Sequence, residues 1–173
     1  MKTATLSAIC LFLLGLTVLQ FCVKPPDYPN EPVIEFKSIS KTQTFQDIDV
    51  LPDDTIRLTF TYTDGDGDIG SMGSDSVSSV FFVDRRDNST LVPGDRLPFV
   101  EPQGTGNGIS GEISVRLRRS CCIYIGPGGI SQACEAAALA IARDTVTYEV
   151  FIRDRAGHES NRILTPPIVL ICK

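Results

Sequence analysis

The chain has 173 residues, of which 42% are hydrophobic and 21% are charged, and this is the balance of a single globular domain. The 21 acidic residues outnumber the 16 basic ones, and the net charge of −5 argues against non-specific nucleic-acid binding and against a basic membrane-surface patch. The absence of Trp disfavours a sugar-binding platform built on indole stacking.

Residues 1–21 have the pattern of a signal peptide, in which Lys2 supplies the positive charge and Leu6 to Leu19 the apolar run. The run ends in Leu19-Gln20-Phe21-Cys22, which resembles a bacterial lipobox, whose Cys is lipidated and becomes the mature N-terminus. Phe21 departs from that pattern, because the position normally holds a small residue. The alternative is an uncleaved anchor, because Leu6 to Val23 spans 18 residues, just enough to cross a bilayer. We favour lipidation of Cys22, and both alternatives tether the chain to a membrane from outside the cytoplasm.

Residues 22–32 form a tether whose prolines impose extended backbone and space the folded part, residues 33–173, from the membrane. The clearest strand of that domain is Thr55–Tyr62, where apolar and polar residues alternate over eight positions. Similar patterns predict the other strands at Val33–Ser40, Thr42–Phe45, Ser78–Asp84, within Thr90–Val100, Ile109–Arg118, Val146–Arg153 and Ile163–Cys172, the last interrupted by Pro166-Pro167.

One stretch breaks this pattern, because the alanine-rich segment Ser131 to Ala142 predicts a short helix with Ser131 as its N-cap. About seven short strands with regular turn signals, and one short helix in an insertion, predict an all-β fold. The expected architecture is an antiparallel β-sandwich.

The strand Thr55–Tyr62 leads into a loop that carries three carboxylates at alternate positions, Asp64, Asp66 and Asp68. Hard cations such as Ca²⁺ take roughly six to eight oxygen ligands, and closely spaced carboxylates supply them. The three aspartates match the first, third and fifth positions of an EF-hand loop, but Ile69 stands where that loop needs Gly, so this is not an EF-hand. The alternative is a plain polar turn, since Asp-Gly pairs form turns for backbone reasons alone.

A fourth carboxylate, Asp154, follows the strand Val146–Arg153. This strand and Thr55–Tyr62 have the most regular alternation in the chain, so both are expected at the centre of the sandwich. If their loops open at the same end, Asp154 joins Asp64, Asp66 and Asp68 as a metal ligand. Without a cation, four carboxylates at one point would repel one another. The sequence thus predicts a Ca²⁺ site made of four aspartates.

Apart from Cys10 in the leader and Cys22, four cysteines remain, Cys121, Cys122, Cys134 and Cys172. An even number in an oxidising compartment predicts two disulfides. Adjacent cysteines rarely bond to each other, and in an alternating strand they would point to opposite faces. We therefore expect one of the adjacent pair to bond to Cys134 and the other to Cys172. A zinc site is the weaker alternative, because the spacing lacks a Cys-x-x-Cys pair.

His158 is the only histidine and lies in the turn after Asp154. Catalysis would need a nucleophile or a carboxylate placed beside it, so we expect a structural or surface role. Paired-carboxylate hydrolysis is an alternative that no motif supports.

The lipobox-like leader, the Pro-rich tether, the Asp-Gly-Asp-Gly-Asp run and the Asp154-Arg155-Ala156-Gly157 turn together resemble a family of small Bacteroidota lipoproteins without an assigned activity. The resemblance covers most of residues 22–173 and implies that the sandwich is immunoglobulin-like. It also implies attachment to the outer membrane by the N-terminal lipid. The turn resembles the Asp-x-Ala-Gly-Asn turn of bacterial immunoglobulin-like domains, although His158 replaces the Asn. The segment from Cys121 to Cys134 does not match the family pattern.

These features predict a non-catalytic, lipid-anchored module of the cell envelope that acts in binding or assembly, with a protein or glycan partner and no nucleic acid. The alternative is a surface lipoprotein that binds carbohydrate or another ligand. A sugar-binding protein should expose an aromatic platform, for which the candidates are Tyr124, Phe99 and Phe151. A hydrolase should instead bring His158 or two carboxylates into one pocket.

Overall fold

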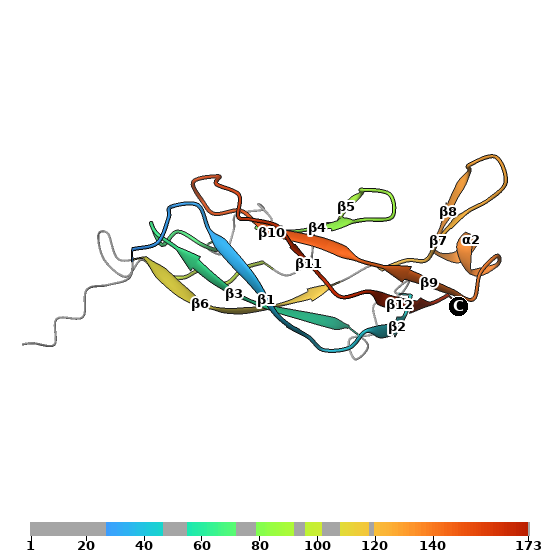
Figure 1. Ribbon diagram of the computed structural model, residues 1–173, viewed down its shortest axis with the longest axis horizontal. Helices are drawn as coiled ribbons and strands as arrows, with labels where there is room; N and C mark the ends of the chain where they lie inside the picture. The colour runs from blue at the N-terminus through green and yellow to red at the C-terminus, as the bar shows by residue number, and fades with distance from the viewer. Residues whose placement is uncertain are drawn as a thin grey trace, which may run out of the picture.

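The computed structural model describes residues 27–46, 55–71, 79–91, 96–101, 108–117 and 120–172 (Figure 1). The expected signal peptide 1–21, Cys22 and the first part of the tether lie outside the described residues. The strands are β1 (Val33–Ile39), β2 (Gln43–Phe45), β3 (Ile56–Asp64), β4 (Val80–Asp84), β5 (Thr90–Leu91), β6 (Ile109–Leu117), β7 (Ile123–Ile125), β8 (Ser131–Ala133), β9 (Arg143–Val146), β10 (Tyr148–Ile152), β11 (Ile163–Leu164) and β12 (Ile168–Ile171), and the helix in the described residues is α2 (Glu135–Ala138).

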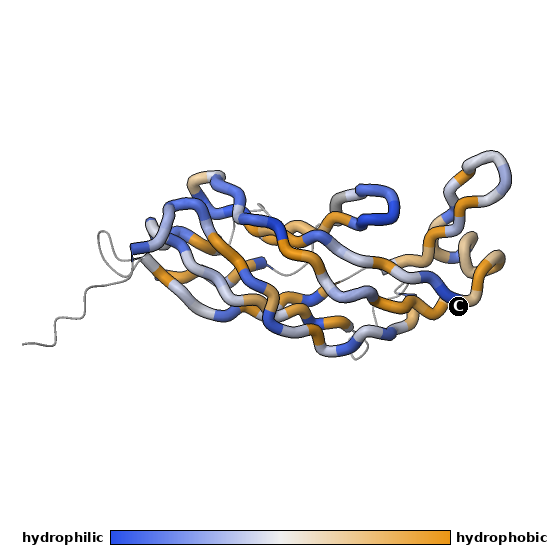
Figure 2. The backbone as a smooth tube through the Cα atoms, viewed as in Figure 1, coloured by the Kyte–Doolittle hydropathy of each residue, from blue (hydrophilic) through white to orange (hydrophobic). Residues whose placement is uncertain are grey.

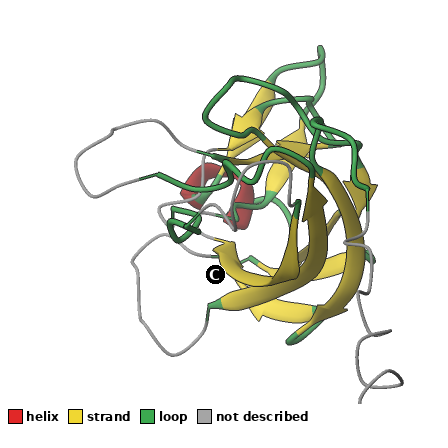
Figure 3. Ribbon diagram, turned by 90° about the vertical axis from the view of Figure 1, so that its left-hand side faces the viewer, coloured by secondary structure: helices red, strands yellow, loops and turns green. Residues whose placement is uncertain are grey.

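Apart from the hairpin of β7 and β8, the strands form two layers. One layer is the antiparallel sheet β1-β3-β6, and the other contains β11-β10-β4-β5 and β2-β12-β9. These last two sheets follow each other along the chain, because only Thr147 separates β9 from β10 and only three residues separate β11 from β12. Seen along the long axis, the strands surround a common interior (Figure 3). The expected all-β fold, with antiparallel sheets and one short helix, is confirmed.

The chain changes layer between its first two strands. Strand β1 pairs antiparallel with β3, whereas β2 pairs in parallel with β12 of the other layer. The connection between β1 and β2 therefore ties the two sheets together at one side of the sandwich.

Period-two alternation builds the core. In β3 the side chains of Ile56, Leu58, Phe60 and Tyr62 are buried, and the intervening positions face outward. In β10 the alternate residues Tyr148, Val150 and Ile152 are fully buried, and β6 contributes Ile113, Val115 and Leu117. Burying such side chains contributes about 1.5–3 kcal/mol each, which explains why the alternating pattern determines which face of each strand turns inward. Figure 2 shows this alternation as orange segments along the strands.

Three strand predictions need correction. Val146–Arg153 is not one strand, because it is broken at Thr147 and begins earlier, at Arg143. In β1 the alternation that the strand prediction implies ends early, because Ile34 is buried but Phe36 is 38% exposed, and a register shift follows between Phe36 and Ser38. The third correction is the hairpin of β7 and β8, which was not predicted because the expected helix includes Ser131–Ala133.

The predicted helix from Ser131 to Ala142 is wrong over most of its length. Ser131–Ala133 is strand β8, and the helix is the single turn Glu135–Ala138 with Cys134, not Ser131, at its N-cap position. Helix propensity differs by only a few tenths of a kcal/mol between most residues. Pairing with β7 and the disulfide at Cys134 outweigh that small preference. Among the described residues, no helix has the length and hydrophobicity needed to cross a membrane.

Candidate metal centre

The alternation of β3 places the first aspartate of the acidic loop inside the domain. Asp64 is the last residue of the strand and follows Tyr62 on the inward face, so its side chain is fully buried. Its backbone still pairs with Ile109 of β6. The sheet thus holds this carboxylate rigidly at the end of the core, where a free turn would have left it in solvent.

The loop after Asp64 folds back on that carboxylate. The N–H of Asp68 donates to Asp64 Oδ2 at 2.9 Å, and Gly67 has the positive φ of 71° that the turn needs. Asp68 Oδ2 in turn accepts the N–H of Ala156 at 2.8 Å, from the turn that follows β10. The side chain of Asp68 therefore joins two loops that lie almost ninety positions apart in the sequence.

The Asp154 turn is built around its own carboxylate. Asp154 Oδ1 accepts the N–H groups of Gly157 at 2.6 Å and His158 at 2.8 Å, and Oδ2 lies 2.9 Å from Nδ1 of His158. The Asp154 side chain is fully buried, whereas that of His158 is 41% exposed. The contact with Asp154 raises the pKa of His158. The expected structural role of His158 is consistent with these contacts, since the residue closes the turn.

The structure brings the four predicted ligands together. Each of Asp64, Asp66, Asp68 and Asp154 offers a carboxylate oxygen, and these oxygens all lie within 4.8 Å of one another. The condition for convergence, that the loops after β3 and β10 open at the same end of the sandwich, is met. A second group, Asp66, Asp154 and His158, satisfies the same distance and would offer a nitrogen ligand.

Two oxygens in this group have no hydrogen-bond partner. They are Oδ1 of Asp64 and Oδ1 of Asp68, and both are buried. A buried acceptor without a partner costs about 1–3 kcal/mol, and more if it is charged. Asp66, by contrast, is exposed. The centre therefore contains two buried unpaired carboxylate oxygens and one accessible carboxylate beside them.

The electrostatics of the centre favour either a proton or a cation. Burial raises the pKa of Asp64 to about 6, and the charges of Asp66, Asp68 and Asp154 act in the same direction. Burial also raises the pKa of Asp68, as do the charges of Asp154 and Asp66. Arg155 lies nearby, but its guanidinium donates to the carbonyls of Ile69 at 3.2 Å and Gly70 at 3.0 Å. No ion pair joins Arg155 to any of the four aspartates, all of which the structure describes.

Arg155 instead positions the loop. Besides binding the carbonyls of Ile69 and Gly70, its guanidinium lies over the ring of Phe99 with 4.9 Å to the centroid. The backbone N–H of Arg155 donates to the carbonyl of Asp68 at 3.3 Å. Sequence reasoning missed this role because an Arg in a polar turn has no distinguishing local pattern.

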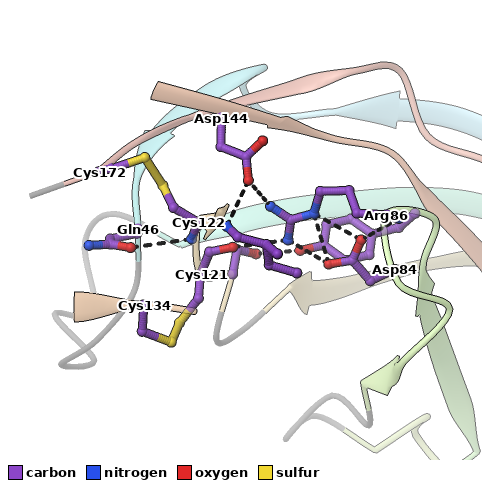
Figure 4. The surroundings of a disulfide bond; sticks show 11 residues. Gln46, Asp84, Arg86, Cys121, Cys122, Cys134, Asp144 and Cys172 are labelled. Atoms are coloured by element: carbon purple, nitrogen blue, oxygen red, sulfur yellow. Dashed lines mark hydrogen bonds and ion pairs between the residues drawn. A yellow bond between two sulfur atoms is a disulfide. The ribbon is translucent and has the colours of Figure 1, made fainter. Parts of the chain in front are cut away.

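The opposite end of the sandwich carries the disulfides (Figure 4). Cys121 bonds to Cys134 and Cys122 to Cys172, so the expected use of all four cysteines is confirmed and the open choice between the adjacent two is resolved. The N–H of the buried Cys122 donates to Oε1 of Gln46 at 3.2 Å, which holds β2 against this junction.

An ion network lies next to the disulfides. Arg86 pairs with Asp84 and with Asp144, and its Nη2 also donates to the carbonyl of Cys121 at 2.9 Å (Figure 4). Asp144 Oδ2 accepts the N–H of Ile123 at 2.8 Å, where β7 begins. Sequence reasoning missed this network, because its members come from three separate parts of the chain.

Comparisons with protein-family models, with curated proteins and with solved structures gave no match. The geometry of the metal centre is therefore the main basis for a functional proposal.

Proposed function

We propose that the protein is a non-catalytic, lipid-anchored module of the cell envelope that acts in binding or assembly and whose fold Ca²⁺ stabilises. The observation that carries the metal proposal is the pair of buried, unpartnered oxygens, Asp64 Oδ1 and Asp68 Oδ1. They belong to a group of four aspartates whose oxygens lie within 4.8 Å of one another. A cation at this point would give both oxygens a partner and would offset the repulsion between the carboxylates.

Oxygen-only ligands favour a hard cation. Asp64, Asp66 and Asp68 have free carboxylate oxygens to offer, whereas both oxygens of Asp154 already accept hydrogen bonds within its turn. Nδ1 of His158, which would favour zinc, is engaged by Asp154 Oδ2. The first three aspartates are therefore the principal ligands that we propose, with Asp154 as a weaker fourth. Ca²⁺, which accepts a flexible set of oxygen ligands, fits this arrangement better than Zn²⁺.

Thermal unfolding with and without the cation tests the metal proposal. At a Ca²⁺ concentration one hundred times the dissociation constant, binding stabilises the fold by about 2.7 kcal/mol. We expect the melting temperature to rise by about 5 to 10 °C over its value in EDTA. Asp66→Asn should abolish the rise, and Asp154→Asn should reduce it less.

The matched control for this test is Glu135→Gln, which removes one negative charge from an exposed position of helix α2 at the other end of the domain. This variant should keep the full response to Ca²⁺. Identical melting curves in Ca²⁺ and EDTA would show that Asp64–Gly70 is a structural turn that binds no Ca²⁺. A larger response to Zn²⁺ than to Ca²⁺ would point instead to Asp66, Asp154 and His158, and would reopen the hydrolase alternative.

The proposed membrane attachment is supported by the Leu19-to-Cys22 box. Metabolic labelling with an alkyne analogue of palmitate should mark the wild-type protein, and Cys22→Ser should remove the label or leave an unprocessed precursor. A wild-type protein without label would support the uncleaved anchor instead.

A role in binding or assembly is supported by apolar residues at the disulfide end. Ile125 and Ile130 flank the tip of the β7–β8 hairpin and are 65% and 66% exposed, and Leu139 after α2 is 92% exposed. Large apolar side chains exposed at one end of a domain are consistent with a surface that contacts a partner. Figure 2 shows this end of the molecule, with the hairpin extending away from the sheets.

The alternative, binding of a carbohydrate or another ligand, is supported by a different feature. A shallow hollow of about 370 Å³ lies on the β1-β3-β6 sheet, and its lining includes Glu35, Thr61, Thr63 and Ser110. The aromatic candidates support it less, because the buried Phe151 stacks on Phe81 and is covered by Arg162, while Phe99 lies under Arg155. Binding of the wild-type protein, but not of Thr61→Val, to glycans on an array would favour this alternative.

A further inference from the structure

The N-terminal segment that leads into β1 lies directly against the acidic loop. The N–H of Gly65 donates to the carbonyl of Pro29 at 2.7 Å. Gly65 stands between Asp64 and Asp66, two of the proposed cation ligands. The segment Asp27–Pro32, which we call the docked segment, is thus hydrogen-bonded to the backbone of the metal loop itself.

Two glycines make room for this contact. A Cβ at Gly65 would overlap the carbonyl oxygens of Tyr28 and Pro29, the latter at 2.7 Å, and all of the atoms that it would meet belong to the backbone. A Cβ at Gly108 would lie 2.7 Å from the ring of Tyr28 and 2.9 Å from the carbonyl of Asp64. Neither glycine has a positive φ, unlike Gly67 and Gly70. Close passage of the docked segment, rather than backbone conformation, is what requires glycine at these two positions.

The docked segment is fixed again where it enters the sheet. The side chain of Asn161 accepts the N–H of Ile34 at 2.7 Å and donates to the carbonyl of Ile34 at 2.9 Å. Asn161 lies three residues after His158, at the end of the stretch that begins with the Asp154 turn. Each of the two loops that carry the proposed ligands therefore also holds the chain that enters β1, one at Pro29 and the other at Ile34.

The charge at the centre connects the ion to this contact. Without a cation, Asp64, whose backbone the sheet fixes, repels Asp66 and Asp68, and the loop that begins at Gly65 would then loosen its contact with Pro29. With a cation, the carboxylates converge and hold Gly65 in place. Proteins use such loops, fixed by an ion and released without it, as switches.

We propose that the cation locks the docked segment onto Gly65 and Gly108, so that the direction in which the N-terminal tether leaves the domain depends on the cation. This inference rests on the proposed Ca²⁺ site and adds a regulatory role to it. In millimolar Ca²⁺ the domain would stand in one orientation on its tether. After removal of Ca²⁺ the N-terminal chain would be fixed to the domain only where it enters β1, at Ile34. The domain would then turn more freely on its tether.

The absence of Trp from the chain allows a clean test. Asp27→Trp introduces a single indole at an exposed position of the docked segment. In the full chain, time-resolved fluorescence anisotropy should show the nanosecond component of Trp motion falling about twofold in amplitude when CaCl₂ replaces EDTA. Calorimetric titration of the same protein with CaCl₂ measures binding of the ion independently.

A second variant separates docking from binding. Gly65→Ala, made in the Asp27→Trp background, keeps all four carboxylates but places a methyl group against Tyr28 and Pro29. We expect Ca²⁺ to bind while the anisotropy no longer responds. Gly126→Ala is the matched control, because its Cβ would make only ordinary contacts, at 3.4 Å or more, in the β7–β8 turn. If Gly65→Ala does not fold, Tyr28→Ser removes the ring that contacts Gly108 and tests the same point.

The two readouts distinguish the failure of each proposal. Absence of calorimetric Ca²⁺ binding in the parent protein would overturn both the metal site and the lock. Binding of Ca²⁺ with an unchanged anisotropy of the indole at position 27 would overturn the lock alone. A response that persists in Gly65→Ala would also overturn it, because docking at Gly65 would then not transmit the ion.

Discussion

At one end of the sandwich, Asp84 and Asp144 share the guanidinium of Arg86. At the other end, Asp64 and Asp68 are just as much part of the folded interior, yet no ion pair with a side chain of the described residues neutralises either of them. Both ends join strands from distant parts of the chain with buried carboxylates. They differ in where the compensating positive charge comes from.

This difference has a thermodynamic consequence. At the disulfide end, the guanidinium of Arg86 supplies the positive charge and two disulfides cross-link the chain. The stability of this end should therefore vary little with ions in the medium. If the acidic end holds Ca²⁺ as we propose, its compensating charge comes from a proton or an external cation, so its stability should vary with both.

Loss of the longer disulfide should have the largest effect. Cys122→Ala with Cys172→Ala opens a bridge between residues 50 positions apart, and the chain-entropy model gives a loss of about 4 kcal/mol. Cys121→Ala with Cys134→Ala, with a separation of 13, should lose about 3 kcal/mol. Urea unfolding followed by circular dichroism measures both. A greater loss from the shorter bridge would contradict the entropic account.

Removal of the positive charge of Arg86 should have the next largest effect. Arg86→Met leaves the carboxylates of Asp84 and Asp144 without their partner, and breaking a buried pair in this way costs about 3 kcal/mol or more. The matched control is Lys37→Met, which breaks an exposed pair with Glu112 and should cost less than about 1 kcal/mol. Equal losses in urea unfolding would show that Arg86 does not compensate a buried charge.

Neutralising one carboxylate at each end should shift stability in opposite directions. In EDTA at pH 7.5, Asp64→Asn removes an unpaired buried charge and should raise the free energy of unfolding by about 1–2 kcal/mol, while the amide oxygen keeps the bond from the Asp68 N–H. Asp84→Asn removes a partner of Arg86 and should lower it. Destabilisation by Asp64→Asn in EDTA would mean that the site is electrostatically satisfied without an ion.

The dependence on pH should be the smallest effect, about 1 kcal/mol. The pKa of Asp64 in the folded protein is about 6, above its ordinary value of 3.8, so the folded state binds the proton more tightly. In EDTA the resulting stabilisation is present at low pH and is lost as the pH rises through about 6. The raised pKa of His158 acts with the same sign. Melting temperatures in EDTA should therefore increase from pH 7.5 to pH 5.5.

Two comparisons make the pH measurement specific. Saturating Ca²⁺ should remove the increase, because the ion takes the place of the proton at Asp64. Asp64→Asn should leave the shares that belong to Asp68 and His158, and His158→Asn should remove the second of these. A melting temperature in EDTA that falls steadily on acidification would show that other carboxylates dominate.

Much of the fold could be predicted from local patterns. The alternation from Ile56 to Tyr62 correctly predicts the strand β3 and its inward face, and it also determines that Asp64 turns inward. The helix prediction for Ser131 to Ala142 failed, because the weak preference of alanine for helix was set against pairing with β7 and a disulfide at Cys134. Local patterns predict secondary structure reliably where burial of one face enforces them, and unreliably where they rest on helix propensity alone.

The sequence by itself determined most of the strands, the number of disulfides and the candidate ligands, because these follow from residue types and from spacings of a few positions. Only the tertiary structure decided that Asp154 meets Asp64, that Cys121 rather than Cys122 bonds to Cys134, and that Gly65 makes room for Tyr28 and Pro29. Each of these contacts joins segments whose separation in sequence carries no periodic signal. They depend on which strand ends share an edge of the sandwich, and packing of the whole core determines that arrangement.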